Sequence, residues 1–309
     1  MQTPLIIITG PTAVGKTDLS IDIAKNINAD IISADSMQIY KYMDIGSAKI
    51  KKEEMKGIKH YLVDEVEPDY EFSVSEFQKR AKNYIKKIRE ENKNVIVTGG
   101  TGLYLNSLIY DMDFAKSNAN NELRDLLNKE LEENGIDYMY EKLKSLDIDS
   151  ANRIHKNNTK RVIRAIEVCL SGKKMNDFSK DLSINKDYKP IIIVLNRERE
   201  NLYKRINLRV DKMIQCGLIS EVKNLLNMNY TKDMISMQGI GYKEIIKYLE
   251  GEYTLEEAIE IIKRDSRRYA KRQLTWFRRY KQAIWFNLDD YNDYEILKND
   301  IIKHIQKVL

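Results

Sequence analysis

Residues 4–17 read PLIIITGPTAVGKT, and this stretch predicts the fold of the chain. Its first half is a short apolar run rich in β-branched residues, which is typical of a buried strand. Its second half, residues 10–17, matches the pattern G-x-x-x-x-G-K-[ST] of a phosphate-binding loop. That pattern belongs between a strand and a helix, and a helix is predicted from about Lys16 to Asn26. The sequence therefore predicts a phosphate-loop α/β fold.

The groups of this loop suit a phosphate ligand. Glycines allow the backbone to curl, so that successive N–H groups point at one phosphate, and the start of the helix adds partial positive charge. Lys16 can neutralise phosphate oxygens, and the Thr17 hydroxyl can bind Mg²⁺. A glycine turn without a ligand is the alternative, and the complete pattern with both flanks disfavours it. The predicted phosphate-binding residues are Gly10, Pro11, Thr12, Ala13, Val14, Gly15, Lys16 and Thr17.

Further strands and helices follow the loop. Buried strands are predicted at 30–35, 94–100 and 190–196, and helices at 73–93 and 102–111. Alternating strands and helices indicate a parallel sheet with helices on both faces. We expect a core of residues 1–112 and 190–309, interrupted by a charged, glycine-poor helical insertion domain at 113–189. The other predicted helices are 121–135 and 157–173 in the insertion, and 201–215, 218–228, 241–249 and 254–281 in a wholly helical C-terminal part.

Composition excludes several classes of protein. The two cysteines, Cys169 and Cys216, cannot form a disulfide framework or a CxxC zinc site, and three scattered histidines offer little to a transition metal. The apolar runs are too short to span a bilayer, and no basic region precedes the first of them. We expect a cytoplasmic enzyme without a membrane partner.

The positive charge is concentrated in one segment. Residues 264–281 hold eight Lys or Arg and one acid, although the net charge of the whole chain is only +5. A basic patch with aromatic residues interleaved indicates a polyanionic partner. A solvated helix face is the simpler alternative for a charge run.

Two positions bear on the chemistry. Asp35 follows the second strand and should lie at the carboxyl edge of the sheet, where open α/β folds bind ligands. It could act as a general base or orient Mg²⁺, or it could simply cap a turn with Ser36. Nucleotide hydrolases usually carry a Mg²⁺-binding Asp at the end of a second strand. Residues 95–100 end in Thr98 and glycines instead, which weakens an ATPase interpretation.

A set of motifs in this order resembles the tRNA dimethylallyltransferase (IPP transferase) family. The motifs run from residue 10 to residue 279 and are highly specific together. They are GPTAVGKT (10–17), DSMQIY (35–40), IGSAK (45–49), HYLVD (60–64), TGGTGLY (98–104), RVIRAIEV (161–168), QGIGYKE (238–244) and KRQLTWFRR (271–279).

The resemblance implies a phosphate-loop fold that binds dimethylallyl diphosphate instead of ATP. The acceptor would be the N6 amine of the adenosine just 3′ of the anticodon, at position 37 of a tRNA, with Mg²⁺ as cofactor and a monomer as the expected state. By the same resemblance Asp35 is the general base, and Lys16, Thr17 and an arginine bind the leaving diphosphate. Arg209 is favoured over Arg205, although either could instead form a surface salt bridge.

The resemblance also implies a binding site for the anticodon stem-loop. The flipped adenine would enter a channel beside residues 35–38, with hydrogen bonds from Gln38, and the basic segment would hold the RNA backbone. Trp276 and Phe277 are expected in the core. The predicted tRNA-binding residues are Asp35, Ser36, Met37, Gln38, Thr101, Arg124, Lys160, Arg161, Arg164, Gln238, Gly239, Gly241, Lys243, Arg268, Lys271 and Arg272.

Three other functions stay open at this point. A small-molecule kinase could use the same phosphate loop, but it gives the basic segment no role. An adenylate prenyltransferase would transfer the same group to AMP, but such enzymes lack the insertion and the long basic tail. A non-catalytic RNA-binding protein would have no need of the intact Lys16, Thr17 and Asp35.

Overall fold

The computed structural model describes residues 2–112, 114, 121–172 and 183–309. The chain forms two compact units. The first unit comprises Met1–Asp111 and Ile184–Leu309, and the second comprises Met112–Ser183.

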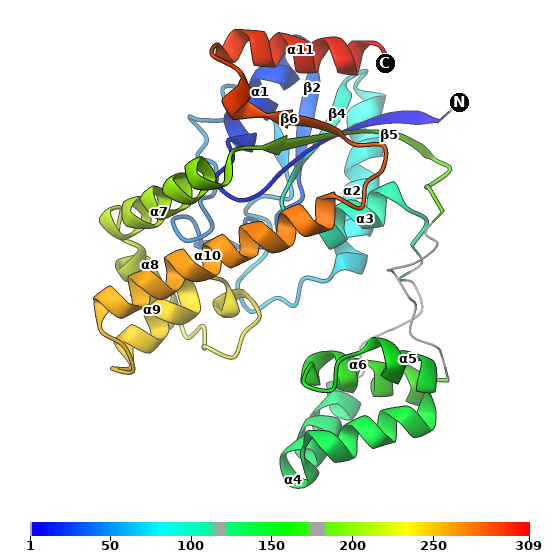
Figure 1. Cartoon of the computed structure of the whole chain (residues 1–309), viewed down its shortest axis with the longest axis vertical. Helices are drawn as coiled ribbons and strands as arrows, with labels where there is room; N and C mark the ends of the chain where they lie inside the picture. Colours follow the sequence, from blue (N-terminus) through cyan, green and yellow to red (C-terminus); the bar gives the residue numbers. More distant parts are fainter. Residues whose placement is uncertain (1, 113, 115–120, 173–182) are drawn as a thin grey trace. The chain divides into compact units, whose positions relative to one another are not determined.

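A parallel sheet forms the centre of the first unit (Figure 1). Its order is β3-β2-β4-β1-β5-β6, and every neighbouring pair is parallel. The chain runs from β1 to one side of the sheet and returns to the other side at β5. The carboxyl ends of the strands therefore border a crevice at β1, where open α/β sheets bind ligands. The strands are β1 (Thr3–Thr9), β2 (Ala29–Ser33), β3 (His60–Tyr61), β4 (Asn94–Gly99), β5 (Tyr188–Asn196) and β6 (Ile284–Asn287).

Helices cover both faces of this sheet, as predicted. The helices of the first unit are α1 (Lys16–Asn26), α2 (Val74–Glu90), α3 (Gly102–Ile109), α7 (Arg199–Gln215), α8 (Leu218–Asn227), α9 (Tyr242–Leu249), α10 (Leu255–Phe277) and α11 (Tyr294–Gln306). Short 3₁₀ turns lie at Ser236–Gln238 and Leu288–Asp290.

Alternation along the buried strands divides the core in two. Leu5 and Ile7 of β1 face one hydrophobic cluster, which α2, α3, α8, α9 and much of α10 complete. Ile6 and Ile8 face the other cluster, which α1, α11 and part of α7 complete. Successive side chains of a strand point to opposite faces, so a continuous apolar run marks a strand buried on both sides.

Some sequence predictions were wrong in detail. The C-terminal part is not wholly helical, because β6 pairs with β5 at one edge of the sheet. The helix predicted over 254–281 ends at Phe277, and a further helix, α11, packs on the sheet. Strand β5 begins at Tyr188, inside the stretch assigned to the insertion, and β3 was not predicted.

The second unit is a small helical bundle. It contains α4 (Asn121–Leu146), α5 (Ile148–Arg153) and α6 (Thr159–Leu170) around its own apolar core. Gly135 interrupts α4 with a φ of 78°, so the helix predicted over 121–135 is followed by another helical segment. The helix predicted over 157–173 is α6, and residue 173 lies outside the described residues. No helix in the described ranges has the length and apolarity that crossing a membrane requires.

Candidate active site

Three loops meet at the carboxyl edge of the central strands. They follow β1, β2 and β4, and hydrogen bonds from two backbone N–H groups and one hydroxyl tie them together. The Ala34 N–H donates to the Thr98 carbonyl oxygen over 2.7 Å, and the Thr101 N–H donates to the Ala34 oxygen over 3.1 Å. The Thr9 hydroxyl donates to the Gly99 oxygen over 2.8 Å. The phosphate loop, the Asp35 loop and the second glycine turn thus form one rigid edge.

The phosphate loop has the close packing that its glycines allow. A β-carbon at Gly10 would lie 2.5 Å from the Leu195 carbonyl oxygen of β5, so no larger residue fits there without a shift. Gly15 precedes α1 in a left-handed conformation with φ 111°, and no side chain caps this helix among the described residues. The first N–H groups of a helix lack intrahelical partners. The start of α1 is therefore suited to an anionic ligand.

Lys16 folds back over this loop. Its Nζ donates to the carbonyl oxygens of Gly10 and Pro11, each over 2.9 Å. Burial lowers the pKa of Lys16 to about 8; nearby Arg209 also lowers it, whereas the Asp35 carboxylate raises it. The ammonium group is thus a costly charge in the ligand-free protein, and an anion in the loop would stabilise it.

The two candidate arginines of α7 have different partners. Arg205 is exposed, and its Nε donates to the Ala13 carbonyl oxygen over 2.9 Å. Arg209 is partly buried, and burial lowers its pKa while Asp35 raises it. Arg209, Lys16 and Asp35 therefore share one electrostatic environment, and Arg205, whose charge also lowers the pKa of Arg209, binds the loop backbone at Ala13.

Asp35 has a local hydrogen-bonding role as well as a place in this cluster. Its Oδ1 accepts the N–H groups of Met37 at 2.9 Å and Gln38 at 3.4 Å. The turn-capping alternative is therefore also met. The adjacent Ser36 N–H donates to the Thr101 hydroxyl over 3.1 Å, so this loop is bound to the second glycine turn.

Gln38 differs from its predicted role. Its amide nitrogen donates to the Ala48 carbonyl oxygen over 3.2 Å, and its amide oxygen accepts from the Ser33 hydroxyl over 3.3 Å. Both ends of the amide are thus engaged inside the protein, and binding an adenine through Gln38 would require one of these bonds to break.

The QGIGY turn lies against the Asp35 loop. A β-carbon at Gly239 would lie 2.6 Å from the Met37 methyl group. Gln238 is exposed, and its amide nitrogen donates to the Lys232 carbonyl oxygen. Gly241 is the N-cap residue before α9, and the Lys243 ammonium lies 3.6 Å from the Glu244 carboxylate. The turn is therefore in contact with the predicted base-binding residues through Met37.

Glu221 of α8 supports the next segment, and sequence reasoning missed it. Its carboxylate accepts the N–H groups of Asp44, Ile45 and Gly46 over 2.7–3.0 Å, and the Tyr242 hydroxyl over 2.7 Å. A carboxylate that accepts several backbone N–H groups orders a loop. No spacing in the sequence pairs Glu221 with residues 44–46, which lie about 175 positions earlier.

Two inward-facing side chains of α10 reach the site. The buried Gln273 contacts both the phosphate loop and the second glycine turn. Trp276 packs against Gly102, and its indole N–H donates to the Asn106 side chain over 3.3 Å. Phe277 is fully buried, which confirms its predicted place in the core, whereas Trp276 is partly buried and packs against the same cluster.

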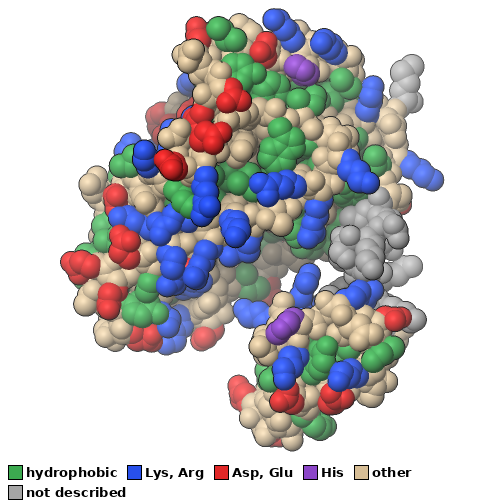
Figure 2. Space-filling model, in the orientation of Figure 1, with side chains coloured by type: hydrophobic (Ala, Val, Ile, Leu, Met, Phe, Trp, Pro, Cys, Tyr) green, Lys and Arg blue, Asp and Glu red, His purple; other side chains and the backbone are tan. Residues whose placement is uncertain are grey.

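The outer face of α10 carries the basic patch. Figure 2 shows Lys and Arg side chains gathered along this helix. Some of this charge is compensated, because Asp265 pairs with both Arg264 and Arg268 at 2.9 and 3.4 Å. Lys271 and Arg272 are exposed one turn further on. A polyanion could bind this surface through the latter pair.

Four predicted tRNA-binding residues belong to the second unit. Arg124 and Arg164 flank the buried Glu167 at 3.2 and 2.8 Å, so both guanidinium groups have a structural partner. The ion pairs lower the pKa of the Glu167 carboxyl, although its burial alone would raise it. Lys160 and Arg161 are exposed at the start of α6 and are better placed for an external ligand.

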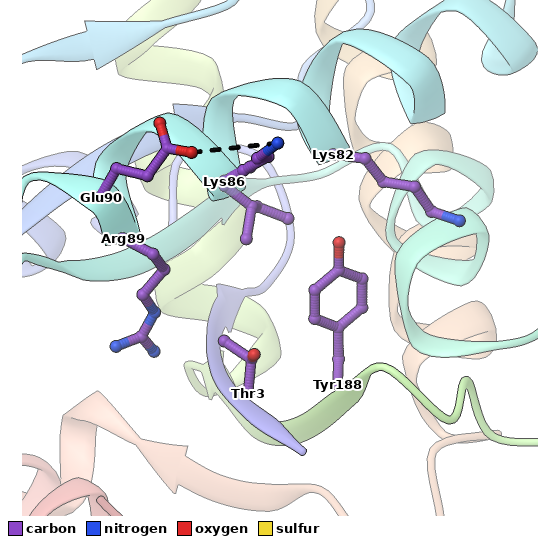
Figure 3. Close-up of a pocket in the computed structure, with 7 residues that line it drawn as sticks. Thr3, Lys82, Lys86, Arg89, Glu90 and Tyr188 are labelled. Carbon is purple, nitrogen blue, oxygen red and sulfur yellow. Dashed lines mark ion pairs between the residues drawn. The ribbon is translucent and has the colours of Figure 1, made fainter. Parts of the chain in front are cut away.

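A separate cleft of about 420 Å³ lies at the amino ends of β1 and β5 (Figure 3). Thr3 and Tyr188, at the amino ends of β1 and β5, line it together with Lys82, Lys86 and Arg89 of α2. The phosphate loop follows the opposite, carboxyl end of β1. This cleft is therefore distinct from the candidate active site.

Known proteins match nearly the whole chain. The sequence model of the IPP transferase family matches residues 38–280. This chain belongs to the IPP transferase family. It is 74% identical over 305 residues to a tRNA dimethylallyltransferase of Clostridioides difficile, covering 99% of this chain and 98% of that protein. It is 60% identical to the protein of that name from Alkaliphilus oremlandii, covering 98% and 97% of the two chains.

Solved structures of family members agree with the fold. The tRNA isopentenylpyrophosphate transferase of Bacillus halodurans superposes with a TM-score of 0.74 at 42% identity, covering 99% of this chain and 98% of that one. A eukaryotic dimethylallyltransferase acting on tRNA superposes with a TM-score of 0.81 at 29% identity. That match covers 97% of this chain and 78% of the other. The predicted phosphate-loop α/β architecture is thus confirmed.

The donor groups at the site are compatible with Mg²⁺ that binds together with a diphosphate. Magnesium sites in phosphate-transfer proteins commonly use one or two protein oxygens, substrate phosphates and water. The Thr17 hydroxyl at the start of α1 and the Asp35 carboxylate are oxygen donors of this kind. No group of three His, Cys, Asp or Glu side chains in the described ranges could hold a metal by itself.

Proposed function

We propose that this IPP transferase family member transfers the dimethylallyl group of dimethylallyl diphosphate to the N6 amine of adenosine 37 in tRNA. The products are N6-isopentenyladenosine and diphosphate. The main support is the clustering of Lys16, Arg209 and Asp35 beside a phosphate loop, without an acidic residue at the end of β4. This arrangement combines cations for a leaving group with a base for an amine. The names of its relatives support tRNA as the acceptor.

The proposed reaction is a direct displacement. The adenine amine attacks C1 of the dimethylallyl group, a new N–C bond forms, and the C1–O bond breaks with its electron pair passing to the diphosphate. The adenine lone pair is delocalised into its ring, so the amine must lose a proton as the bond forms. The Asp35 carboxylate accepts this proton. Bound Mg²⁺ would neutralise charge on the diphosphate oxygens.

The chain's own cations stabilise the leaving diphosphate. Lys16 and the first N–H groups of α1 belong to the loop that would hold it, and Arg209 adds a second cation close to Asp35. Such groups act most strongly on charge that develops in the transition state. The loop stays in place through Arg205 at Ala13 and Arg197 at Val14, which both bind its carbonyl oxygens.

The acceptor side is proposed to use the basic surface. Exposed Lys271, Arg272 and Arg268 of α10 would bind the RNA backbone, together with Lys160 and Arg161 of the second unit. Residues 35–37 and Thr101 border the site where the flipped adenine would bind, against the turn at Gly239. We propose that the protein acts as a cytoplasmic monomer.

Nucleoside mass spectrometry provides the direct test. Purified protein, dimethylallyl diphosphate, Mg²⁺ and unmodified tRNA should yield isopentenyladenosine, and omission of the donor should abolish it. Prenylation of AMP but not of tRNA would instead indicate an adenylate prenyltransferase. Absence of either product, together with tight binding of ATP, would indicate a kinase.

The two arginines of α7 should differ in their effect on catalysis. Arg209→Ala is expected to lower kcat by about 30- to 100-fold, because it removes a cation from the leaving group. Arg205→Ala removes one hydrogen bond to the Ala13 carbonyl oxygen and should lower kcat/KM by less than about tenfold. Steady-state kinetics with saturating tRNA would compare them. A larger loss of kcat in Arg205→Ala would reverse the assignment.

A further inference from the structure

Gln273 joins two loops of the site through one side chain. Its Oε1 accepts the Thr12 N–H of the phosphate loop over 2.9 Å, and its Nε2 donates to the Gly100 carbonyl oxygen over 3.0 Å. Gln273 is only 5% exposed. Gln273 lies in the KRQLTWFRR motif, within the basic segment whose predicted role is RNA binding, so the sequence predicts neither contact.

The surroundings leave Gln273 little freedom. A β-carbon at Gly100 would overlap its amide nitrogen, so the second glycine turn closes directly on the amide. The Tyr269 hydroxyl, one turn earlier on α10, lies close to the side chains of Thr101 and Gln273, and burial raises its pKa to about 12. Thr101 in turn accepts the Ser36 N–H. A continuous polar chain therefore links the Asp35 loop, the glycine turn and the phosphate loop.

We propose that Gln273 is a positioning residue that holds the phosphate loop in its diphosphate-binding shape by bridging Thr12 and Gly100. The proposal rests on the proposed function for the identity of the donor, but the bridge itself concerns diphosphate binding alone. An amide suits this position because it offers one acceptor and one donor side by side. Neither a carboxylate nor an alkyl group can both accept from the Thr12 N–H and donate to the Gly100 carbonyl oxygen.

Loss of the Gln273 bridge should affect the phosphate loop and diphosphate binding, but not tRNA binding. Loss of the bridge leaves the partly buried Thr12 N–H and the buried Gly100 carbonyl oxygen without their partner, which should displace the loop. The affinity for a diphosphate should then fall, since the loop holds that group. The affinity for tRNA should stay nearly constant, because the basic surface of α10 faces away from Gln273.

Two substitutions separate hydrogen bonding from packing. Gln273→Leu keeps a similar volume and loses both bonds. Gln273→Glu, when ionised, can still accept from Thr12, but it places an oxygen against the Gly100 carbonyl and a negative charge beside the diphosphate site. When protonated, the same Glu has one acceptor and one O–H donor, as Gln does. Burial should raise its pKa above the ordinary value of about 4.3.

Calorimetry with inorganic diphosphate and Mg²⁺ tests the proposal without any acceptor. We expect Gln273→Leu to weaken diphosphate binding about 10- to 100-fold at every pH from 5.5 to 8. Relative to wild type, the affinity of Gln273→Glu for diphosphate should be lowest at pH 8. It should rise at least about fivefold on acidification to pH 5.5. The Kd for tRNA should change less than about twofold in both variants.

Controls distinguish the alternatives. Gln215→Leu, at an exposed position on α7, should bind diphosphate as wild type does. Wild-type affinity in Gln273→Leu would overturn the proposal, and so would a Gln273→Glu defect that is independent of pH. If Gln273→Leu fails to fold, the pH dependence of diphosphate binding by Gln273→Glu still tests the bridging role of Gln273. Failure of the wild type to prenylate tRNA would refute the proposed function and leave the diphosphate measurement valid.

Discussion

Replacing Asp35 by Asn should abolish turnover and leave the loop intact. The Asn side-chain oxygen can still accept the N–H groups of Met37 and Gln38, so the turn at 35–38 should persist. An amide cannot take a proton from the adenine amine. General bases typically contribute about 10²- to 10⁴-fold, so we expect kcat to fall by at least about 1,000-fold. Single-turnover measurements with saturating donor and tRNA would report the chemical step.

A second variant separates the two roles of Asp35. Asp35→Ala removes both the base and the turn cap, and it should be as slow as Asp35→Asn while binding tRNA within about threefold of wild type. If Asp35→Asn were nearly as fast as wild type and only Asp35→Ala were slow, the residue would serve the turn and not the chemistry. Asp69→Asn, at an exposed position far along the chain, is the matched control and should retain full activity.

The phosphate loop and the sheet could be predicted because their signals are local. Buried parallel strands need an apolar run, and the glycines after β1 and β4 mark where those runs end. The position of Asp35 at the carboxyl edge followed from the same topology. These features depend on residues close together in the sequence, so no knowledge of packing was required.

The missed strands depend on partners distant in sequence. β3 has two residues, and β6 has four residues at the edge, with Trp285 partly exposed. Neither stretch is long enough to show a strand period. Their conformation comes from pairing with β2 and β5, which the local sequence does not reveal. Helix α11 is different: its apolar residues, including Leu297 and Ile301, recur at helical spacing and could have been recognised.

The different contacts made by side chains of α7 and α10 could not be predicted from the sequence for a related reason. Arg205 and Arg209 are four residues apart and share a helix face, yet one binds the Ala13 carbonyl and the other faces Asp35. Gln273 lies within a basic segment, yet it points inward. Charge and spacing locate a helix face, but only tertiary packing decides which side chain reaches which loop.

Lys16→Ala should have the largest effect on donor binding. It removes the only side-chain cation of the phosphate loop sequence 10–17. Charge-assisted hydrogen bonds contribute about 1.5–3 kcal/mol each, so the loss of two such bonds to the diphosphate should raise the Kd for dimethylallyl diphosphate at least about 100-fold. The Kd for tRNA should be nearly unchanged. Lys25→Ala, at an exposed position on the same helix, should bind the donor as wild type does. Unchanged donor affinity in Lys16→Ala would contradict the role of the loop.

The pH dependence of binding gives a second test. In the ligand-free protein the pKa of Lys16 is lowered to about 8, whereas a bound diphosphate should raise it. Donor binding at higher pH must therefore be accompanied by proton uptake, and the wild-type affinity should fall as the pH rises above about 8. Lys16→Ala lacks this group, so its weak affinity should be nearly independent of pH from 7.5 to 9.5. A parallel decline in both proteins would assign the titration to another group.

The same lowered pKa predicts a gain in stability when the charge is removed. Lysine in the unfolded chain titrates near 10.5, so below pH 8 both states hold the proton and the folded state bears the cost of a desolvated ammonium. This cost diminishes between pH 8 and 10.5, where the folded state has released its proton. The free energy of unfolding of Lys16→Met should therefore exceed that of wild type by about 1–2 kcal/mol at pH 7. The difference should vanish near pH 10.5. Denaturant unfolding at the two pH values would measure it. A loss of stability at pH 7 would show that the bonds of Lys16 to Gly10 and Pro11 outweigh its desolvation.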